Sequence, residues 1–360
     1  MLDGMSRVVR AAVSLAVCVI PAGAAEIDKP TVAWIETALN RWETACRRYL
    51  NLPSHPLPWV ILFDERAAWH VNPEKAWLPP HRQLKSSVKF VGRKYPLIQV
   101  EHRDGRLWVP DRDPLPVKSG GAAMPYDNDR NVFFELALPS LWRRESGVPP
   151  SRDLDETVLG FALHELTHTR QLAGVVGRIE AMRSRSVLPE SVNDNLIENT
   201  FGKNAEYKKM FDDEFGHLSR ALLADDPKLI REAISEALAA SQRRRERFFV
   251  GDYQGWSGLD DIFLVMEGMG MWVHYRMARD HAPKGEDWRR TATVLGSRGD
   301  TWSQLEGLAL ILLIDRFVPG WQARFLAPGF PSPFAVLREA LNAPQIRINQ
   351  AAPSASPRSP

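Results

Sequence analysis

Two histidines and a glutamate stand close together in the stretch GFALHELTHTRQLAG, residues 160–174. His164 and His168 are four positions apart, so on an α-helix they lie about one turn apart on the same face. Two imidazole nitrogens on one rigid element are typical ligands of zinc. Glu165 stands beside the first ligand, where a carboxylate can take a proton from a zinc-polarised water. The pattern predicts a Zn²⁺ site with His164 and His168 as ligands and Glu165 as the general base.

A catalytic zinc needs a third protein ligand and one position left open for water. Glu267 is the best candidate, because it lies within the apolar run FLVMEGMGMWVHYRM, where an unpaired carboxylate is costly to bury. Gly268 and Gly270 would allow another helix to come close. The alternative is an interior glutamate that is neutralised by an arginine. Three other glutamates remain open as the third ligand: Glu214, Glu206 and Glu198.

The HELTH motif, followed by a distant Glu-Gly pair in an apolar helix, resembles the gluzincin group of zinc metallopeptidases. This resemblance implies that His164, His168 and Glu267 hold the metal and that Glu165 is the catalytic base. It also implies a zincin-like fold. Glu267 follows His168 by 99 positions (267 − 168), a longer separation than in those families, so two further helices are expected between them.

Peptide hydrolysis also needs a donor that stabilises the tetrahedral oxyanion. Tyr275 and His274 are candidates, and His274 falls about 20° from Glu267 on a helical wheel. Two further candidates are Tyr253 and Arg170.

The β-rich run NVFFELALP, residues 131–139, precedes the HELTH motif. In the gluzincins and other zincins, an extended peptide binds along an edge strand that lies ahead of the catalytic helix, held by main-chain hydrogen bonds. We therefore expect this run to be either that edge strand or an ordinary core strand.

The order of elements predicts an α+β fold in two halves, 26–150 and 151–342. Short β-rich runs between prolines and glycines occupy residues 57–140. Amphipathic or apolar helical spacing marks seven segments: 30–50, 154–175, 204–224, 227–248, 260–279, 301–317 and 333–341.

The N-terminus predicts export. Arg7 and Arg10 precede the apolar run AAVSLAVCVI and the small residues of PAGAAE, which is the order of a signal peptide over residues 1–25. The mature protein would be periplasmic or secreted, with no membrane anchor. Residues 343–360 are rich in Pro, Ser and Ala and predict a disordered tail.

Composition excludes few function classes, but a formal net charge of +2 gives no electrostatic reason to expect nucleic acid as a partner. The sequence therefore favours an exported zinc-dependent hydrolase, most simply a peptidase that acts on a peptide or protein. An amidase that acts on cell-wall peptides would use the same site. The alternative from another class is an exported helical binding or scaffold protein, with no metal or with a structural zinc only.

Overall fold

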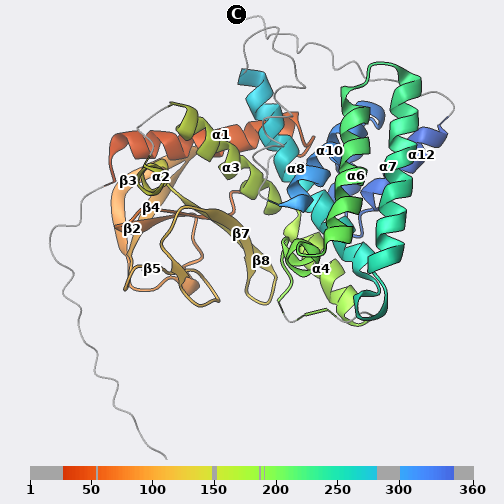
Figure 1. The fold of residues 1–360 in the computed structure, drawn as a ribbon. Coiled ribbons are helices and arrows are strands. Elements are labelled where there is room, and N and C mark those ends of the chain that lie inside the picture. Colours follow the sequence, from red (N-terminus) through yellow and green to blue (C-terminus); the bar gives the residue numbers. More distant parts are fainter. Residues whose placement is uncertain are drawn as a thin grey trace, which may run out of the picture.

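The computed structural model describes residues 27–53, 56–147, 152–185, 188–189, 191–281 and 301–343. It shows an α+β protein with a sheet-containing N-terminal half and a helical C-terminal half, as the sequence predicts (Figure 1). The predicted signal peptide and the predicted disordered tail lie outside the described residues, apart from Ala343. None of the described helices is both long and apolar enough to cross a bilayer.

Six strands form the main sheet in the order β3-β4-β2-β1-β8-β7. Neighbouring strands are antiparallel except for the parallel pair of β1 and β8. The strands are β1 (Trp59–Phe63), β2 (Ala67–Val71), β3 (Arg82–Phe90), β4 (Arg93–Glu101), β7 (Gly121–Tyr126) and β8 (Asn131–Ala137). A small hairpin of β5 (Arg106–Leu107) and β6 (Leu115–Pro116) forms a second sheet, and a 3₁₀ turn, η1, spans Lys75–Trp77.

The two faces of the sheet are covered differently, because side chains alternate between faces along each strand. Helices α1 (Lys29–Arg48) and α3 (Arg152–His168) lie over one face, and β5 lies on the other side (Figure 1). Helix α2 (Pro139–Ser146) follows β8, and its buried Leu141 belongs to the core on the hairpin side. Phe134 and Leu136 of β8 belong to a core that continues into the helical half, whereas Phe133 and Ala137 belong to a smaller core on the hairpin side. The larger core therefore joins the two halves of the chain.

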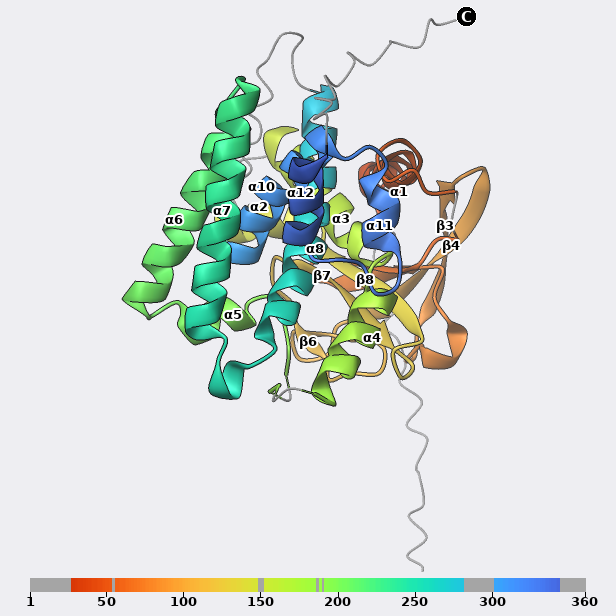
Figure 2. The ribbon, with the colours of Figure 1, turned by 90° about the vertical axis from the view of Figure 1, so that its right-hand side faces the viewer.

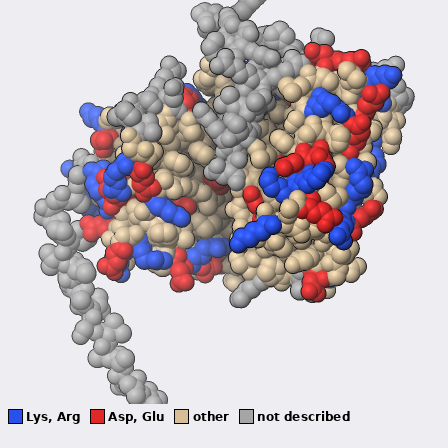
Figure 3. Space-filling view, viewed as in Figure 1, with Lys and Arg blue, Asp and Glu red and all other residues tan. Residues whose placement is uncertain are grey.

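The helical half surrounds one central helix, α8 (Trp256–His281), which is buried on all sides from Leu259 to Tyr275. Figure 2 shows α6 and α7 side by side, with α12 nearby. On the face drawn in Figure 3, basic and acidic side chains are interspersed over both halves. The other elements are α4 (Leu172–Arg183), α5 (Leu196–Phe201), α6 (Ala205–Leu223), α7 (Pro227–Phe248), η2 (Gly251–Tyr253), α10 (Trp302–Phe317), α11 (Trp321–Leu326) and α12 (Pro333–Asn342).

Local signals set several helix ends. Asp28 begins α1 by accepting a hydrogen bond from the Thr31 backbone N–H at 2.7 Å, and Asp226 begins α7 in the same way, directly before Pro227. An acceptor at the N-cap and a proline in the first turn are the preferred residues there.

A pair of glycines brings α8 and α10 into close contact. A Cβ atom at Gly268 would lie 2.5 Å from the Gly307 carbonyl oxygen, and one at Gly307 would lie 2.6 Å from the Leu264 carbonyl oxygen. Neither backbone can carry a larger side chain without moving. Gly268 thus has the packing role expected of it, although its neighbour is α10 rather than the helix with the HELTH motif.

Two sequence predictions need correction. The run 131–139 is not an edge strand: β8 lies between β1 and β7, and the free edge beside it belongs to β7, whose small residues gave no clear strand signal. The predicted helix 154–175 is two helices, because α3 ends at His168 and α4 begins at Leu172. The break at 169–171 turns the chain directly after the second histidine.

Candidate metal centre

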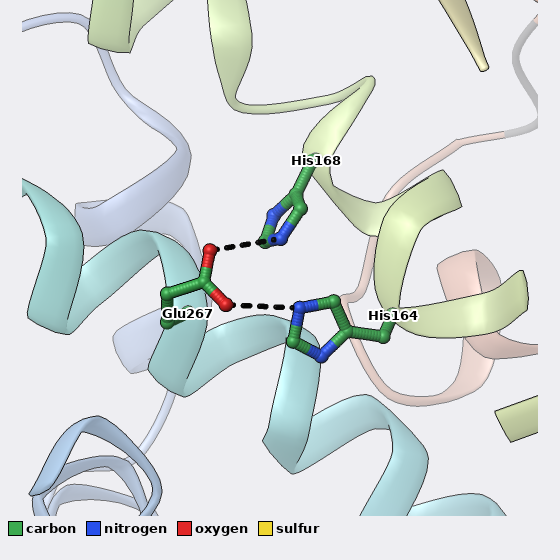
Figure 4. Close-up of side chains that lie close together, drawn as sticks. All are labelled: His164, His168 and Glu267. Atoms are coloured by element: carbon green, nitrogen blue, oxygen red, sulfur yellow. Dashed lines mark hydrogen bonds and ion pairs between the residues drawn. The ribbon is translucent and has the colours of Figure 1, made fainter. Parts of the chain in front are cut away.

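His164, His168 and Glu267 meet at the contact between α3 and α8 (Figure 4). His164 Nε2 lies 3.1 Å from Glu267 Oε2, and His168 Nε2 lies 3.3 Å from Glu267 Oε1. All three side chains are at least 95 % buried. Within the described ranges this is the one group of three His, Cys, Asp or Glu residues whose ligand atoms all lie within 4.8 Å of one another. The fold thus brings together the three residues that the sequence selected.

The second histidine is oriented by the turn that follows it. His168 Nδ1 lies 2.9 Å from Gln171 Oε1, and since an amide oxygen can only accept, Nδ1 carries the proton in this contact. This leaves Nε2, the atom that faces Glu267, without a hydrogen-bonding partner of good geometry although it is buried. The Glu267 carboxylate still raises the pKa of His168 to about 9, against the opposing effect of burial. Gln171 therefore has a site role that the sequence left undecided.

Glu267 is contacted by Gln304 of α10 as well as by the two histidines of α3. Gln304 of α10 donates a hydrogen bond from Nε2 to Glu267 Oε2 at 3.0 Å. Burial would raise the pKa of this carboxyl, but the imidazoles of His168 and His164 outweigh burial and hold the pKa well below its usual range. Glu267 is therefore a carboxylate, as a cation ligand must be. Among the described residues no arginine pairs with Glu267, and its charged partners there are the two imidazoles rather than the guanidinium of the alternative.

Gly270 makes the approach of α8 to α3 possible. A Cβ atom at this position would lie 2.8 Å from His164 Cε1 and Nδ1, closer than such atoms approach one another. The glycine one turn past Glu267 therefore sets the separation between the two helices that carry the cluster.

The donor set fits a divalent metal with mixed nitrogen and oxygen preference. Two imidazoles and one carboxylate are three of the ligands that zinc accepts in catalytic sites, and they leave the fourth tetrahedral position for water or substrate. His168 Nε2 is buried without a hydrogen-bond partner of good geometry, which fits an atom that would bind a metal ion. The same set would accept other transition metals, so the geometry indicates a metal class rather than zinc alone.

Glu165 lies beside this cluster and against the free edge of the sheet. Its Oε2 accepts a hydrogen bond from the Ala123 backbone N–H of β7 at 3.2 Å, and its Oε1 lies 4.0 Å from His164 Nε2. The Glu165 side chain is 17 % exposed, so it lies at the border of the cluster rather than in its buried interior. Burial raises its pKa above the usual value, against the attraction of His168 and His164. A carboxylate with a raised pKa is suited to accepting a proton.

Two acids near the cluster were missed by the sequence reasoning. Burial, and then the charge of Glu165, raise the pKa of Glu135 on β8 to about 8. Burial, and then the charge of Glu267, raise the pKa of Asp194, just before α5, to about 6. Neither stands at a recognisable spacing from the HELTH motif, so only the fold could reveal them.

The expected oxyanion donors do not join the three-residue group. The Tyr275 hydroxyl accepts a hydrogen bond from Arg279 Nη1 at 3.0 Å, and its other charged neighbours, Arg276 and Asp315, are outside the cluster. His274 packs against α3 one turn before His164, where its Nε2 occupies the space that a Cβ atom of Gly160 would need.

The two other donors considered are placed differently. The Tyr253 ring packs against Phe201 and Trp256, with centroids 5.0 and 4.9 Å away. Arg170 is partly buried and lies near Glu43 and the Cys46 thiol of α1. An oxyanion role for any of the four residues stays a prediction.

The alternative third ligands have other partners. Glu214 is fully buried, and its Oε2 accepts a hydrogen bond from Arg244 Nε at 2.6 Å. Glu206 pairs with Arg247 at 3.1 Å on the surface, and Glu198 accepts a hydrogen bond from the Trp302 backbone N–H at 3.0 Å. Glu214 therefore belongs to a buried ion network, and its burial alone was a misleading signal.

Comparisons with protein-family models, curated proteins and solved structures find no match to this chain. The function is therefore inferred from the cluster and its surroundings.

Proposed function

We propose that this chain is an exported zinc-dependent peptidase with a zincin-like arrangement of its catalytic elements. The observation that carries the proposal is the convergence of His164, His168 and Glu267, with Glu165 between this cluster and a free strand edge. A metal that only stabilised the fold would need a fourth protein ligand and no neighbouring base.

Each side chain has a defined task in the proposed reaction. His164, His168 and Glu267 would hold the zinc, which would polarise the scissile carbonyl and acidify a water when bound. Glu165 accepts the proton of the attacking water and returns it to the leaving amine, a role suited to its raised pKa. Gln171 and Gln304 keep His168 and Glu267 in the orientation that binding requires.

The free edge of β7 supports a peptide as substrate. The Ala137 backbone N–H donates to the Gly120 carbonyl at 2.9 Å, which places the even-numbered residues of β7 toward β8 and the odd-numbered ones toward the free edge. The outward N–H of Ala123 accordingly reaches Glu165. An extended peptide added along this edge would meet the backbone groups of Gly121 and Ala123 beside the metal ligands.

One observation favours the alternative of a protein without a catalytic metal. The His164–Glu267 contact is by itself a satisfied buried hydrogen bond, with a distance of 3.1 Å. In that case the protein would be a binding or scaffold protein in which the cluster only joins α3 to α8. Metal content and activity separate the two functions.

The test measures zinc and turnover together in the mature protein and in Glu165→Gln. We expect one zinc per chain in both proteins, and turnover of a mixed peptide substrate that falls by roughly 100-fold or more in the variant. Glu156→Gln is the matched control, because Glu156 is on the same helix but pairs with Arg41 at 2.8 Å. Full activity in Glu165→Gln, or no zinc in the wild type, would exclude the proposed mechanism.

Export is a separate part of the proposal, supported by residues 1–25 of the sequence alone. N-terminal sequencing of the exported protein should begin near Ala25 or Glu26. A mature chain that starts at Met1 or Met5 would contradict it.

A further inference from the structure

A cavity of about 380 Å³ lies in the sheet half, and no residue of its lining belongs to the metal centre. It is found where β3 begins: the pairing of β3 with β4 starts at Arg82 and Gln99, so the last residues of β4 extend beyond their neighbour. The wall includes three arginines and two histidines: Arg82, Arg103, Arg106, His81 and His102. The volume is within the range of small-molecule sites.

Two of the arginines are held directly opposite each other. Arg103 and Arg106 exchange both backbone hydrogen bonds, at 3.3 and 2.9 Å, across a turn in which Asp104 and Gly105 have φ of 52° and 67°. Positive φ at both central residues is typical of a type I′ turn, which fixes the two flanking side chains as a cross-strand pair. Like charges in this position repel each other.

The charge of this pair is not neutralised within the described part of the chain. Neither Arg103 nor Arg106 forms an ion pair there, and the guanidinium of Arg106 donates only to the Pro114 carbonyl. The wall also holds Glu101 and Asp104, so three arginines face two acids. An anion between Arg103 and Arg106 would remove their repulsion and form charge-assisted hydrogen bonds.

The remaining wall is mostly uncharged and includes one tryptophan, Trp108, beside three prolines. Trp108 lines the cavity and packs against His70, with ring centroids 6.0 Å apart. His70 is fully buried and does not line the cavity; its Nδ1 accepts a hydrogen bond from Trp59 Nε1 at 3.1 Å, which holds the ring that Trp108 packs against. An indole surface beside guanidinium groups suits a ligand that has a ring and several oxygen atoms.

We propose that this cavity is a binding site for a small organic anion, a ring compound that carries a carboxylate or phosphate group. The anionic group lies between Arg103 and Arg106, and the ring packs on Trp108. The site is separate from the metal centre, so binding does not require the zinc or the proposed peptidase activity.

The experiment is calorimetric titration of the intact protein with four probes: glucose 6-phosphate, glucuronate, inorganic phosphate and glucose. We expect one of the two ring anions to bind more tightly than inorganic phosphate, and glucose to show no binding. A preference for glucose 6-phosphate identifies a phosphate as the anionic group, and a preference for glucuronate identifies a carboxylate. Raising the salt concentration should weaken binding, because the contacts are charged and near the surface.

Two variants locate the site. Arg103→Gln with Arg106→Gln should weaken binding of the ring anion by at least about tenfold, since it removes two charge-assisted contacts. Arg93→Gln is the matched control, because Arg93 is also exposed at a β-turn but does not line the cavity. Binding should be unchanged in this control and after zinc is removed with a chelator.

Three results would overturn the proposal. The first is that neither ring anion binds at millimolar concentration. The second is that Arg93→Gln loses as much affinity for the ring anion as the double variant does. The third is that inorganic phosphate binds as tightly as the ring anions. Arg93, Arg103 and Arg106 are all exposed, so the variants should remain folded. A thermal melt of each variant verifies this.

Discussion

Glu267→Gln tests the assignment of the third ligand most sharply. The substitution keeps the size of the side chain and its contact with Gln304 but removes the charge that two imidazoles face at 3.1 and 3.3 Å. The pKa of His168 is raised from 6.5 to about 9, so at pH 7.5 the ion pair stabilises the metal-free protein by about 2 kcal/mol, at 1.36 kcal/mol per pKa unit. Glu267→Gln loses this energy, and His168 becomes neutral.

The assay is the melting temperature with and without zinc, together with zinc content after dialysis. Zinc at 100 times its Kd should stabilise the wild type by about 2.7 kcal/mol. With an unfolding entropy of about 2.1 cal/mol/K per residue, this corresponds to a rise in Tm of roughly 4 °C for a chain of this size. Glu267→Gln should melt earlier and show little or no rise, because an amide oxygen carries no charge and is a poor zinc ligand.

Two controls separate ligand loss from general destabilisation. Glu214→Gln breaks a buried pair with Arg244 and should cost about 3–5 kcal/mol, yet keep the rise in Tm on adding zinc. Glu206→Gln, at an exposed pair, should melt like the wild type. If Glu267→Gln bound one zinc with wild-type affinity, or if Glu214→Gln alone lost it, the assignment of Glu267 would be refuted.

Three further predictions concern His168 and Gly270. Zinc must displace the proton of His168, so the apparent zinc affinity should rise about tenfold per pH unit and level off above about pH 9. Competition with a chelator between pH 6.5 and 9.5 measures this affinity, and a flat profile would contradict the prediction. Because this pKa is raised, the ion pair's contribution to stability in the metal-free protein is complete below about pH 6.5 and is lost as pH rises through about 9. Gly270→Ala would place a Cβ atom 2.8 Å from the His164 ring, so it should cost about 1–3 kcal/mol and weaken zinc binding, as a thermal melt and a zinc titration would show. Gly216→Ala, on a helix with open space at that position, should instead be neutral or slightly stabilising, and equal losses in both variants would refute the packing argument.

The sequence determined the parts of this protein that depend on local chemistry. Apolar periodicity placed α1 and α7 within two residues of their observed ends, and each observed start has an N-cap aspartate and a proline in the first turn. The four-residue spacing of His164 and His168 needs only a helix to align the rings, and the isolation of Glu267 in an apolar helix identified it as a charged group that requires a partner. These inferences succeed because hydrogen bonding and side-chain spacing within one helix act over a few residues.

Other features were decided only by tertiary contacts. Glu214 and Glu267 both stand in apolar surroundings, and the fold alone shows that Arg244 faces the first and two histidines face the second. The contact of Ala123 with Glu165 depends on which strand forms the sheet edge, and strand order depends on pairing between distant segments. Gln304 reaches Glu267 because Gly268 and Gly307 allow α8 and α10 to approach closely. Proximity between residues far apart in the chain follows from the packing of whole elements, and no local pattern of residues encodes it.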